Sequence, residues 1–166
     1  MYEVLASFKE LKNEGQLFSI IIKVRPNGVL DQYNSFVKEY FPELQIEILR
    51  DVVMIDVLIK TDLYISIYSQ TLFEASCLGI PSIYYKKDKE HLDAPFDGHS
   101  ELVTVDSIDN LKQAFVDFTN SHPRFDKFLD ITVMEKYIGP LDGKNTIRNI
   151  DFIYGLLDRP AREVLH

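Results

Sequence analysis

Apolar residues recur along this chain at two spacings that alternate. Spacings of three and four residues predict amphipathic helices, whereas short runs rich in β-branched residues predict buried strands. The predicted strands are 17–24, 45–49, 63–67, 81–85 and 102–105. The predicted helices are 2–13, 31–41, 52–60, 70–78, 108–120, 126–137 and 146–157. We expect Asp51 and Ser107 to cap the third and fifth of these helices.

This alternation of strand and helix, with short links, is typical of an α/β fold. It predicts a Rossmann-like, doubly wound parallel sheet of about five or six strands, with helices on both faces and further helices at the C-terminal end. The 166 residues suit a single domain, 1–166, and contain no repeat or linker. The longest irregular stretch is the polar loop 86–101, and loops of that length in compact domains are often functional.

Composition narrows the class of protein. Apolar residues make up 46% of the chain, with 11 Phe and 9 Tyr, which is enough for a real core. The net charge of −8 argues against nucleic acid or anionic lipid as the main partner, because those ligands need a basic face. Cys77 is the single cysteine, so no disulfide can form within the chain. No apolar run reaches the roughly 18 residues of a spanning helix. We therefore expect a soluble, cytoplasmic protein without a transmembrane segment.

Ligands of open parallel sheets bind beyond the carboxyl ends of the strands. The stretches 25–28, 68–71, 86–100 and 139–145 lie there in the predicted fold. Strand 63–67 runs through Ser69 directly into a helix, whose free N–H groups and dipole favour an anion. The hydroxyls of Ser69 and Thr71 add donors, so this helix start is a candidate phosphate site. In the structural alternative, Thr71 and Glu74 form a capping box that only closes the helix.

The same stretch carries a family resemblance. Residues 61–85, TDLYISIYSQTLFEASCLGIPSIYY, are similar to the donor-site segment of GT-B glycosyltransferases of bacterial surface-polysaccharide and teichoic-acid-type biosynthesis. The matching positions are Asp62, Ser66, Ser69, Thr71, Glu74, Ala75, Gly79, Pro81 and Ile83. Two further segments match in order, KVRPN at 23–27 and GPLDGKNTIRNIDFI at 139–153. The resemblance covers roughly residues 17–158 and is to the C-terminal, donor-binding domain of those enzymes.

The resemblance implies a nucleotide-diphosphate sugar as substrate, no separate cofactor, and an acceptor-binding domain or subunit as partner. The resemblance also allows this chain to lie at the inner face of the membrane, held there through its partner domain. The implied donor-phosphate residues are Ser69, Gln70, Thr71 and Arg25. The implied ribose ligand is Glu74. Base or lid contacts are expected from Tyr85, Lys86, Lys87 and His91, with one of Tyr84 and Tyr85 facing the ligand and the other the core. No catalytic residue is assigned.

Two departures from the family pattern affect these expectations. Arg25 stands where the family turn often carries His, and an arginine can still pair with phosphate through two hydrogen bonds. Position 66 is Ser, so the pair of acids eight residues apart found in retaining enzymes is incomplete. The second departure argues against a retaining enzyme of that sort.

The long loop also resembles a metal site superficially. His91 and His99 lie among the acids Asp88, Glu90, Asp93, Asp97 and Glu101. Their spacing matches no structural zinc pattern and no cysteine supports them, so we expect a solvated acidic loop and no metal.

Other functions are kept as alternatives or excluded. One alternative is a domain like that of nucleotide-sugar 2-epimerases, which share the two-domain architecture. Another is a flavodoxin-like or receiver-like signalling or interaction module. Receivers need an Asp at a strand end, where this chain has Arg25, Arg50, Tyr68 and Lys86. The sequence has no P-loop, no Gly-x-Gly-x-x-Gly and no Gly-x-Ser-x-Gly, which argues against kinases, dinucleotide oxidoreductases and α/β-hydrolases.

Overall fold

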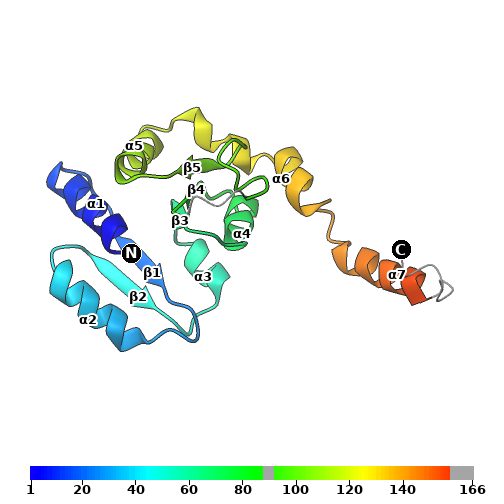
Figure 1. Ribbon diagram of the computed structural model, residues 1–166, viewed down its shortest axis with the longest axis horizontal. Helices are drawn as coiled ribbons and strands as arrows, with labels where there is room; N and C mark the ends of the chain where they lie inside the picture. Colours follow the sequence, from blue (N-terminus) through cyan, green and yellow to red (C-terminus); the bar gives the residue numbers. More distant parts are fainter. Residues whose placement is uncertain (88–91, 158–166) are drawn as a thin grey trace.

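The computed structural model describes residues 1–87 and 92–157, in which strands and helices alternate from the N-terminus (Figure 1). The strands are β1 Ile20–Lys23, β2 Ile46–Leu49, β3 Tyr64–Ser66, β4 Ser82–Tyr85 and β5 Val103–Val105. The α-helices are α1 Tyr2–Asn13, α2 Leu30–Tyr40, α3 Met54–Leu58, α4 Thr71–Cys77, α5 Ile108–Thr119, α6 Ile131–Ile138 and α7 Asn145–Leu157. Two 3-10 turns, η1 Pro123–Phe125 and η2 Lys127–Leu129, precede α6. Each predicted strand segment contains an observed strand, although the observed strands are shorter.

The strands form two parallel sheets. In the first, β1 pairs with β2, and Ile22 lies opposite Ile48. The second has the order β3–β4–β5, with Ile83 of β4 opposite both Ile65 and Val103. The prediction of a parallel α/β fold is confirmed. The expected single sheet of five or six strands is not observed among the described residues, because no ladder of hydrogen bonds joins the two sheets.

Side-chain packing joins the sheets instead. Leu5 and Leu11 of α1 and Phe115 of α5 belong to one buried apolar cluster. Ile22 of β1 and Ile65 of β3 both pack against that cluster. Because strands of both sheets contact the same helices, the burial of apolar surface holds them together where backbone hydrogen bonds do not.

Strand β4 lies at the centre of the second sheet, and all four of its residues are buried. Successive side chains of a strand point to opposite faces. Tyr85 accordingly belongs to a cluster with Leu111 of α5, whereas Tyr84 belongs to another with Phe73 of α4 and Met134 of α6. Helices therefore cover both faces of this sheet, as the alternation of strands and helices predicts.

Two helix starts show how capping chemistry sets an element's bounds. Ser107 caps α5 as predicted, and its Oγ accepts a backbone N–H of the first turn at 3.3 Å. The prediction that Asp51 caps a helix over 52–60 is wrong. Helix α3 begins later and has no side-chain cap. The Asp51 carboxylate accepts a hydrogen bond from Arg50 Nε at 2.9 Å instead, so an adjacent guanidinium occupies it.

The helix predicted over 126–137 begins five residues later, at Ile131. Asp130 precedes it, and the Asp130 carboxylate accepts hydrogen bonds from the N–H and the hydroxyl of Thr132, at 2.8 and 2.7 Å. An N-cap of this kind fixes where the helix begins. The residues before it form the two 3-10 turns, of which η2 lies against α4 and α6 and η1 lies against η2.

The last helix extends away from the rest of the chain (Figure 1). None of the residues of α7 is buried, and several large apolar side chains on it are more than half exposed. These are Ile147, Phe152, Ile153, Tyr154 and Leu157. Among the described residues, none of the helices is long and apolar enough to span a bilayer.

Candidate functional site

The chain passes from β3 into α4 through a tight turn. Ser69 is half-buried there, and its Oγ accepts the N–H of Thr71 at 3.2 Å. The N–H groups of Leu72 and Phe73 donate to the carbonyls of Ser69 and Gln70, at 3.2 and 3.0 Å. The predicted hydroxyl donors therefore lie at the start of α4, and Ser69 is the residue whose side chain closes that start.

The capping box of Thr71 and Glu74 is not formed. Gln70 occupies the N-cap position, and Thr71 is already the first residue of the helix, so its hydroxyl is not placed to receive the N–H of Glu74. Glu74 is exposed, and its carboxylate makes no hydrogen bond to another described residue. The purely structural interpretation of Glu74 is wrong for this helix, and the carboxylate is available to a ligand.

A cavity of about 320 Å³ lies beside this turn. Tyr68 and Gln70 line it from the β3–α4 connection, Phe96 from the following loop, and Tyr137 from α6. The Tyr68 ring is 54% exposed, and its centroid lies 4.8 Å from that of Phe96. Phe96 is buried against Phe73 and Tyr84, so its ring is held in place beside Tyr68.

Sequence reasoning assigned no role to Tyr68, Phe96 or Tyr137, which come from three separate segments. A signal existed for Tyr68, because it directly follows a predicted strand at the edge where ligands bind. None existed for Tyr137, whose place beside the cavity depends on how α6 packs.

An ion pair fixes the wall of the cavity that α6 provides. Glu101 accepts hydrogen bonds from the Tyr137 hydroxyl and from Lys136 Nζ, the latter at 2.9 Å. The Tyr137 hydroxyl, followed by Lys136, lowers the pKa of Glu101 to about 2. Burial and the same carboxylate raise the pKa of Tyr137. Glu101 is therefore ionised at neutral pH and holds α6 to the end of the long loop.

The two lysines that follow β4 differ in their surroundings. Lys86 is half-buried and donates from Nζ to the carbonyl of Asp97 at 3.2 Å, which braces the loop. Asp97 Oδ1 in turn accepts the hydroxyl and N–H of Ser100 and the N–H of His99, and these bonds lower the pKa of Asp97, the Ser100 hydroxyl most. Lys87 is exposed and has no side-chain partner among the described residues.

His91, the remaining lid candidate, lies outside the described residues, as do Asp88 and Glu90 of the superficial metal cluster. Over 1–87 and 92–157, no group of three His, Cys, Asp or Glu side chains is placed to hold a metal ion.

The expectation that one of the two tyrosines ending β4 faces a ligand is wrong in this structure. Tyr85 is 6% exposed and lies in the core, where burial raises its pKa more than Glu3 and Asp106 do. Tyr84 is buried on the opposite face. Both rings are enclosed because helices cover both sides of this strand.

Arg25 is exposed in the turn after β1. The turn is closed by a hydrogen bond from the N–H of Gly28 to the Arg25 carbonyl at 2.8 Å. The Arg25 guanidinium has no partner among the described residues, and Arg25 does not line the cavity beside Tyr68. The structure thus brings Gln70 to that cavity and leaves Arg25 on a separate, exposed turn.

The chain was compared with protein families, with curated proteins and with solved structures. No family model matches the chain, and no curated protein matches it. Among solved structures, the chain is similar to a variant of the wall teichoic acid polymerase TagF, with a TM-score of 0.43 and 12% identity. The similarity covers 93% of this chain and 50% of that one, so this chain spans about half the length of that polymerase.

Proposed function

We propose that this chain is the nucleotide-sugar donor-binding domain of a two-domain GT-B glycosyltransferase that acts in polysaccharide or cell-surface glycan synthesis. One observation carries the proposal. The aromatic cavity of Tyr68 and Phe96 lies directly beside the β3–α4 turn, at which the resemblance to that family places the donor diphosphate. The cavity and the motif coincide at the sheet edge that ligands of such folds occupy.

In this proposal the diphosphate lies against the start of α4, with donors from Ser69, Gln70 and Thr71. Arg25 supplies a cation from the separate turn after β1, and Glu74 accepts hydrogen bonds from the ribose hydroxyls. Donors placed where negative charge develops stabilise a departing diphosphate, and that stabilisation would be this domain's share of catalysis. Lys87, which has no side-chain partner among the described residues, is a further cation for the phosphates. Lys86 serves mainly to hold the loop through its hydrogen bond to the Asp97 carbonyl.

Two exposed apolar surfaces support the proposed second domain. One is α7, whose large side chains have no partner in the described part of the chain. The other is the outer face of α3 with the residues that flank it, where Val53, Ile55 and Ile59 are each more than half exposed. Exposed apolar surface of this kind marks interaction sites in soluble proteins. An acceptor-binding domain on these surfaces would also supply the base that activates the acceptor.

The test is ligand-induced thermal stabilisation without added metal. Uridine or cytidine diphosphate at millimolar concentration should raise the thermal midpoint, because a ligand that binds only the native state stabilises it by mass action. The double variant Ser69→Ala, Thr71→Val should lose most of that shift, measured against its own unliganded midpoint. Ser35→Ala, an exposed change on α2, is the matched control and should keep the shift. A panel of nucleoside diphosphates that gives no shift would overturn the proposal.

A further inference from the structure

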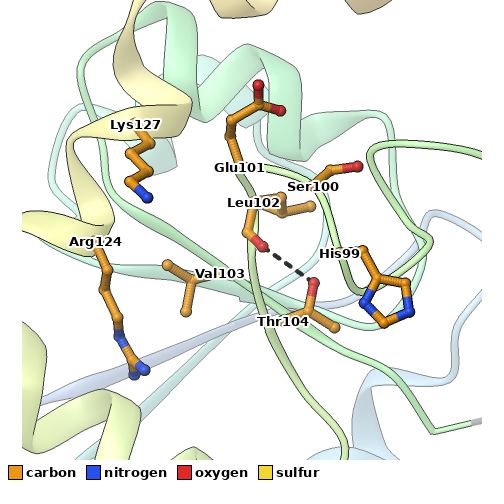
Figure 2. Close-up of a pocket in the computed structure, with 8 residues that line it drawn as sticks. All are labelled: His99, Ser100, Glu101, Leu102, Val103, Thr104, Arg124 and Lys127. Carbon is orange, nitrogen blue, oxygen red and sulfur yellow. Dashed lines mark hydrogen bonds between the residues drawn. The ribbon is translucent and has the colours of Figure 1, made fainter.

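A second groove lies along strand β5, at the edge of the three-stranded sheet opposite β3. It has a volume of about 540 Å³ and is bounded by the segment 99–104 and by the 3-10 turns η1 and η2 (Figure 2). Arg124 and Lys127 extend into its wall from those turns, and His99 lies at its opposite side (Figure 2). None of these residues belongs to the candidate donor site.

The backbone of β5 is available along this groove. β5 is an edge strand among the described residues, because the sheet order is β3–β4–β5. The N–H of Lys86, which follows β4, donates to the carbonyl of Val105 at 2.7 Å, so Val105 turns its polar backbone atoms toward β4. Backbone groups alternate in direction along a strand, so the N–H and C=O of Thr104 point outward. An unpaired donor and acceptor on an edge strand are a template for another strand.

The charges of the groove are unusual for this chain, whose net charge is −8. Lys127 is exposed, and its ammonium has no partner among the described residues. The Arg124 guanidinium lies 5.4 Å from the centre of the Phe125 ring and 3.2 Å from Asp117, and its Nε and Nη2 are buried. Lys127 is thus the cation whose donors a bound partner could use, whereas Arg124 is held by Asp117.

The one carboxylate in the lining does not oppose an acidic partner. Glu101 is bound to Lys136 and Tyr137 of α6, and in Figure 2 its carboxylate points away from Thr104. The groove therefore combines the ammonium of Lys127, which has no partner among the described residues, with both a backbone donor and a backbone acceptor. A simple anion would use only the donors, whereas an extended acidic peptide would use all of them.

We propose that this groove binds an extended acidic peptide segment of a partner protein by strand addition to β5. The peptide backbone pairs with Thr104, and a carboxylate of the peptide contacts Lys127. Strand addition takes its affinity from main-chain hydrogen bonds and its specificity from alternate side chains, which here selects for acids. This inference does not depend on the proposed donor site.

The experiment measures fluorescence polarisation of a short labelled peptide of alternating glutamate and valine, with the full chain at low ionic strength. The chain should bind this peptide and bind the matching lysine–valine peptide at least about ten-fold more weakly. A glutamate–valine peptide methylated on alternate backbone nitrogens should also lose about ten-fold or more, because methylation removes the ladder hydrogen bonds. Uridine diphosphate should not displace the peptide, which separates this groove from the donor site.

Lys127→Glu should weaken binding of the acidic peptide by about ten-fold or more, as expected when one charge-assisted contact is reversed. Lys60→Glu makes the same charge change at an exposed position between α3 and β3 and is the matched control. Both variants are first checked for an unchanged thermal midpoint. Equal binding of acidic and basic peptides, equal binding of the methylated peptide, no binding at all, or equally tight binding of inorganic polyphosphate would each overturn the proposal.

Discussion

Glu74 is the single side chain whose role can be tested most directly. Its carboxylate is exposed and contributes no hydrogen bond to the start of α4, where the Ser69 hydroxyl accepts the N–H of Thr71. A residue without structural bonds can be changed with little effect on folding. Any effect of the change on ligand affinity then reports contact with the ligand.

We therefore predict that Glu74→Gln leaves the unfolding midpoint nearly unchanged but weakens nucleoside diphosphate binding by on the order of ten-fold. Charge-assisted hydrogen bonds to the ribose hydroxyls are worth roughly 1.5–3 kcal/mol, and neutral Gln retains only part of that. Calorimetric affinities of the two proteins for uridine diphosphate decide the matter. Glu47→Gln, an exposed change on β2, is the control. Affinities that agree within about two-fold would exclude the ribose role.

Glu101 gives a prediction about pH. Its pKa is lowered from 4.5 to about 2 by the Tyr137 hydroxyl and Lys136. A carboxyl whose pKa is lowered on folding stabilises the native state above its unfolded pKa, and this contribution disappears as pH falls from about 4.5 to about 2. Glu101→Gln should therefore be less stable than the unmodified chain at pH 6, by on the order of 1 kcal/mol. That difference should shrink steadily toward pH 2.

Denaturant titrations of both proteins between pH 2 and pH 6 measure this difference. Asp109→Asn, an exposed change in the first turn of α5, serves as the control. A difference that is independent of pH would mean that ionisation of Glu101 does not hold α6 in place.

At this scale the sequence predicted where some residues of the candidate site lie and missed others. Ser69, Gln70 and Thr71 lie where a strand passes into a helix, so the local pattern alone predicts their position at this edge of the sheet. Tyr137 lines the cavity from α6, and its position depends on how that helix packs. The prediction that Tyr85 faces a ligand was wrong. Alternation along a strand shows that its side chains point to two faces of the sheet, but it does not show that helices cover both faces.

Among the structural elements, the turn after β1 restricts most strongly which residue type can occupy one of its positions. A Cβ added at Gly28 would lie 2.4 Å from Val24 Cγ1 and 3.1 Å from the Arg25 carbonyl. Val24 is 2% exposed and its branched side chain has little freedom to move. A side chain at this position would therefore force Val24 or the turn that presents Arg25 to shift.

We predict that Gly28→Ala destabilises the chain by about 1–3 kcal/mol, the usual cost of forcing a methyl group into a packed site. Denaturant unfolding measures it. Gly155→Ala is the matched control, because its added methyl group meets no atom within 4 Å and lies in a helix that favours alanine. If both variants unfold at the same denaturant concentration, the close packing of this turn is absent in solution.

Helix α7 gives the second prediction about an element. Its apolar side chains touch none of the buried clusters of the described residues. Replacing Ile150, Ile153 and Leu157 together by serine should therefore leave the thermal midpoint within about 1 °C of the original. A loss of 1 kcal/mol would lower the midpoint by about 2–4 °C in a chain of this size. The same variant should lose its affinity for a partner domain.

Leu58→Ser in α3 is the contrasting control, because Leu58 is 1% exposed and its loss should cost about 3 kcal/mol or more. A fall of many degrees in the α7 variant would show that this helix packs on the rest of the chain in solution.

For the elements as a group, apolar spacing predicted type and order but not length. The five strand segments were correct because each is a short β-branched run between turn residues. Helix α3 was predicted too long because the apolar residues 52 and 53 continue the helical spacing, although Asp51 is occupied by Arg50 and gives no cap. The local competition for one carboxylate is not visible in a hydrophobic pattern.

For the whole molecule, the sequence predicted the parallel α/β class but not its division into two sheets. Strands β1 and β3 both pack their side chains against the cluster formed by α1 and α5, but no ladder of backbone hydrogen bonds joins them, and apolar spacing does not predict whether such a ladder forms. The same packing leaves the outer face of α3 and all of α7 uncovered, which is the basis for expecting a second domain.

The last prediction follows from that expectation. Under the proposed function, this chain binds the donor and stabilises the leaving diphosphate, while the base that activates the acceptor belongs to the other domain. The purified chain should therefore bind nucleoside diphosphates yet show no glycosyl transfer to an added acceptor. Losing a general base typically costs 10²–10⁴-fold in rate, and the loss of acceptor positioning adds to it. Transfer is measured with radiolabelled nucleotide sugars, and the double variant Ser69→Ala, Thr71→Val provides the background. Supplying an acceptor-binding domain in trans should restore turnover for the unmodified chain and far less for that variant. Robust transfer by the chain alone, abolished in the variant, would show that the acceptor site lies within these 166 residues and that the second domain is unnecessary.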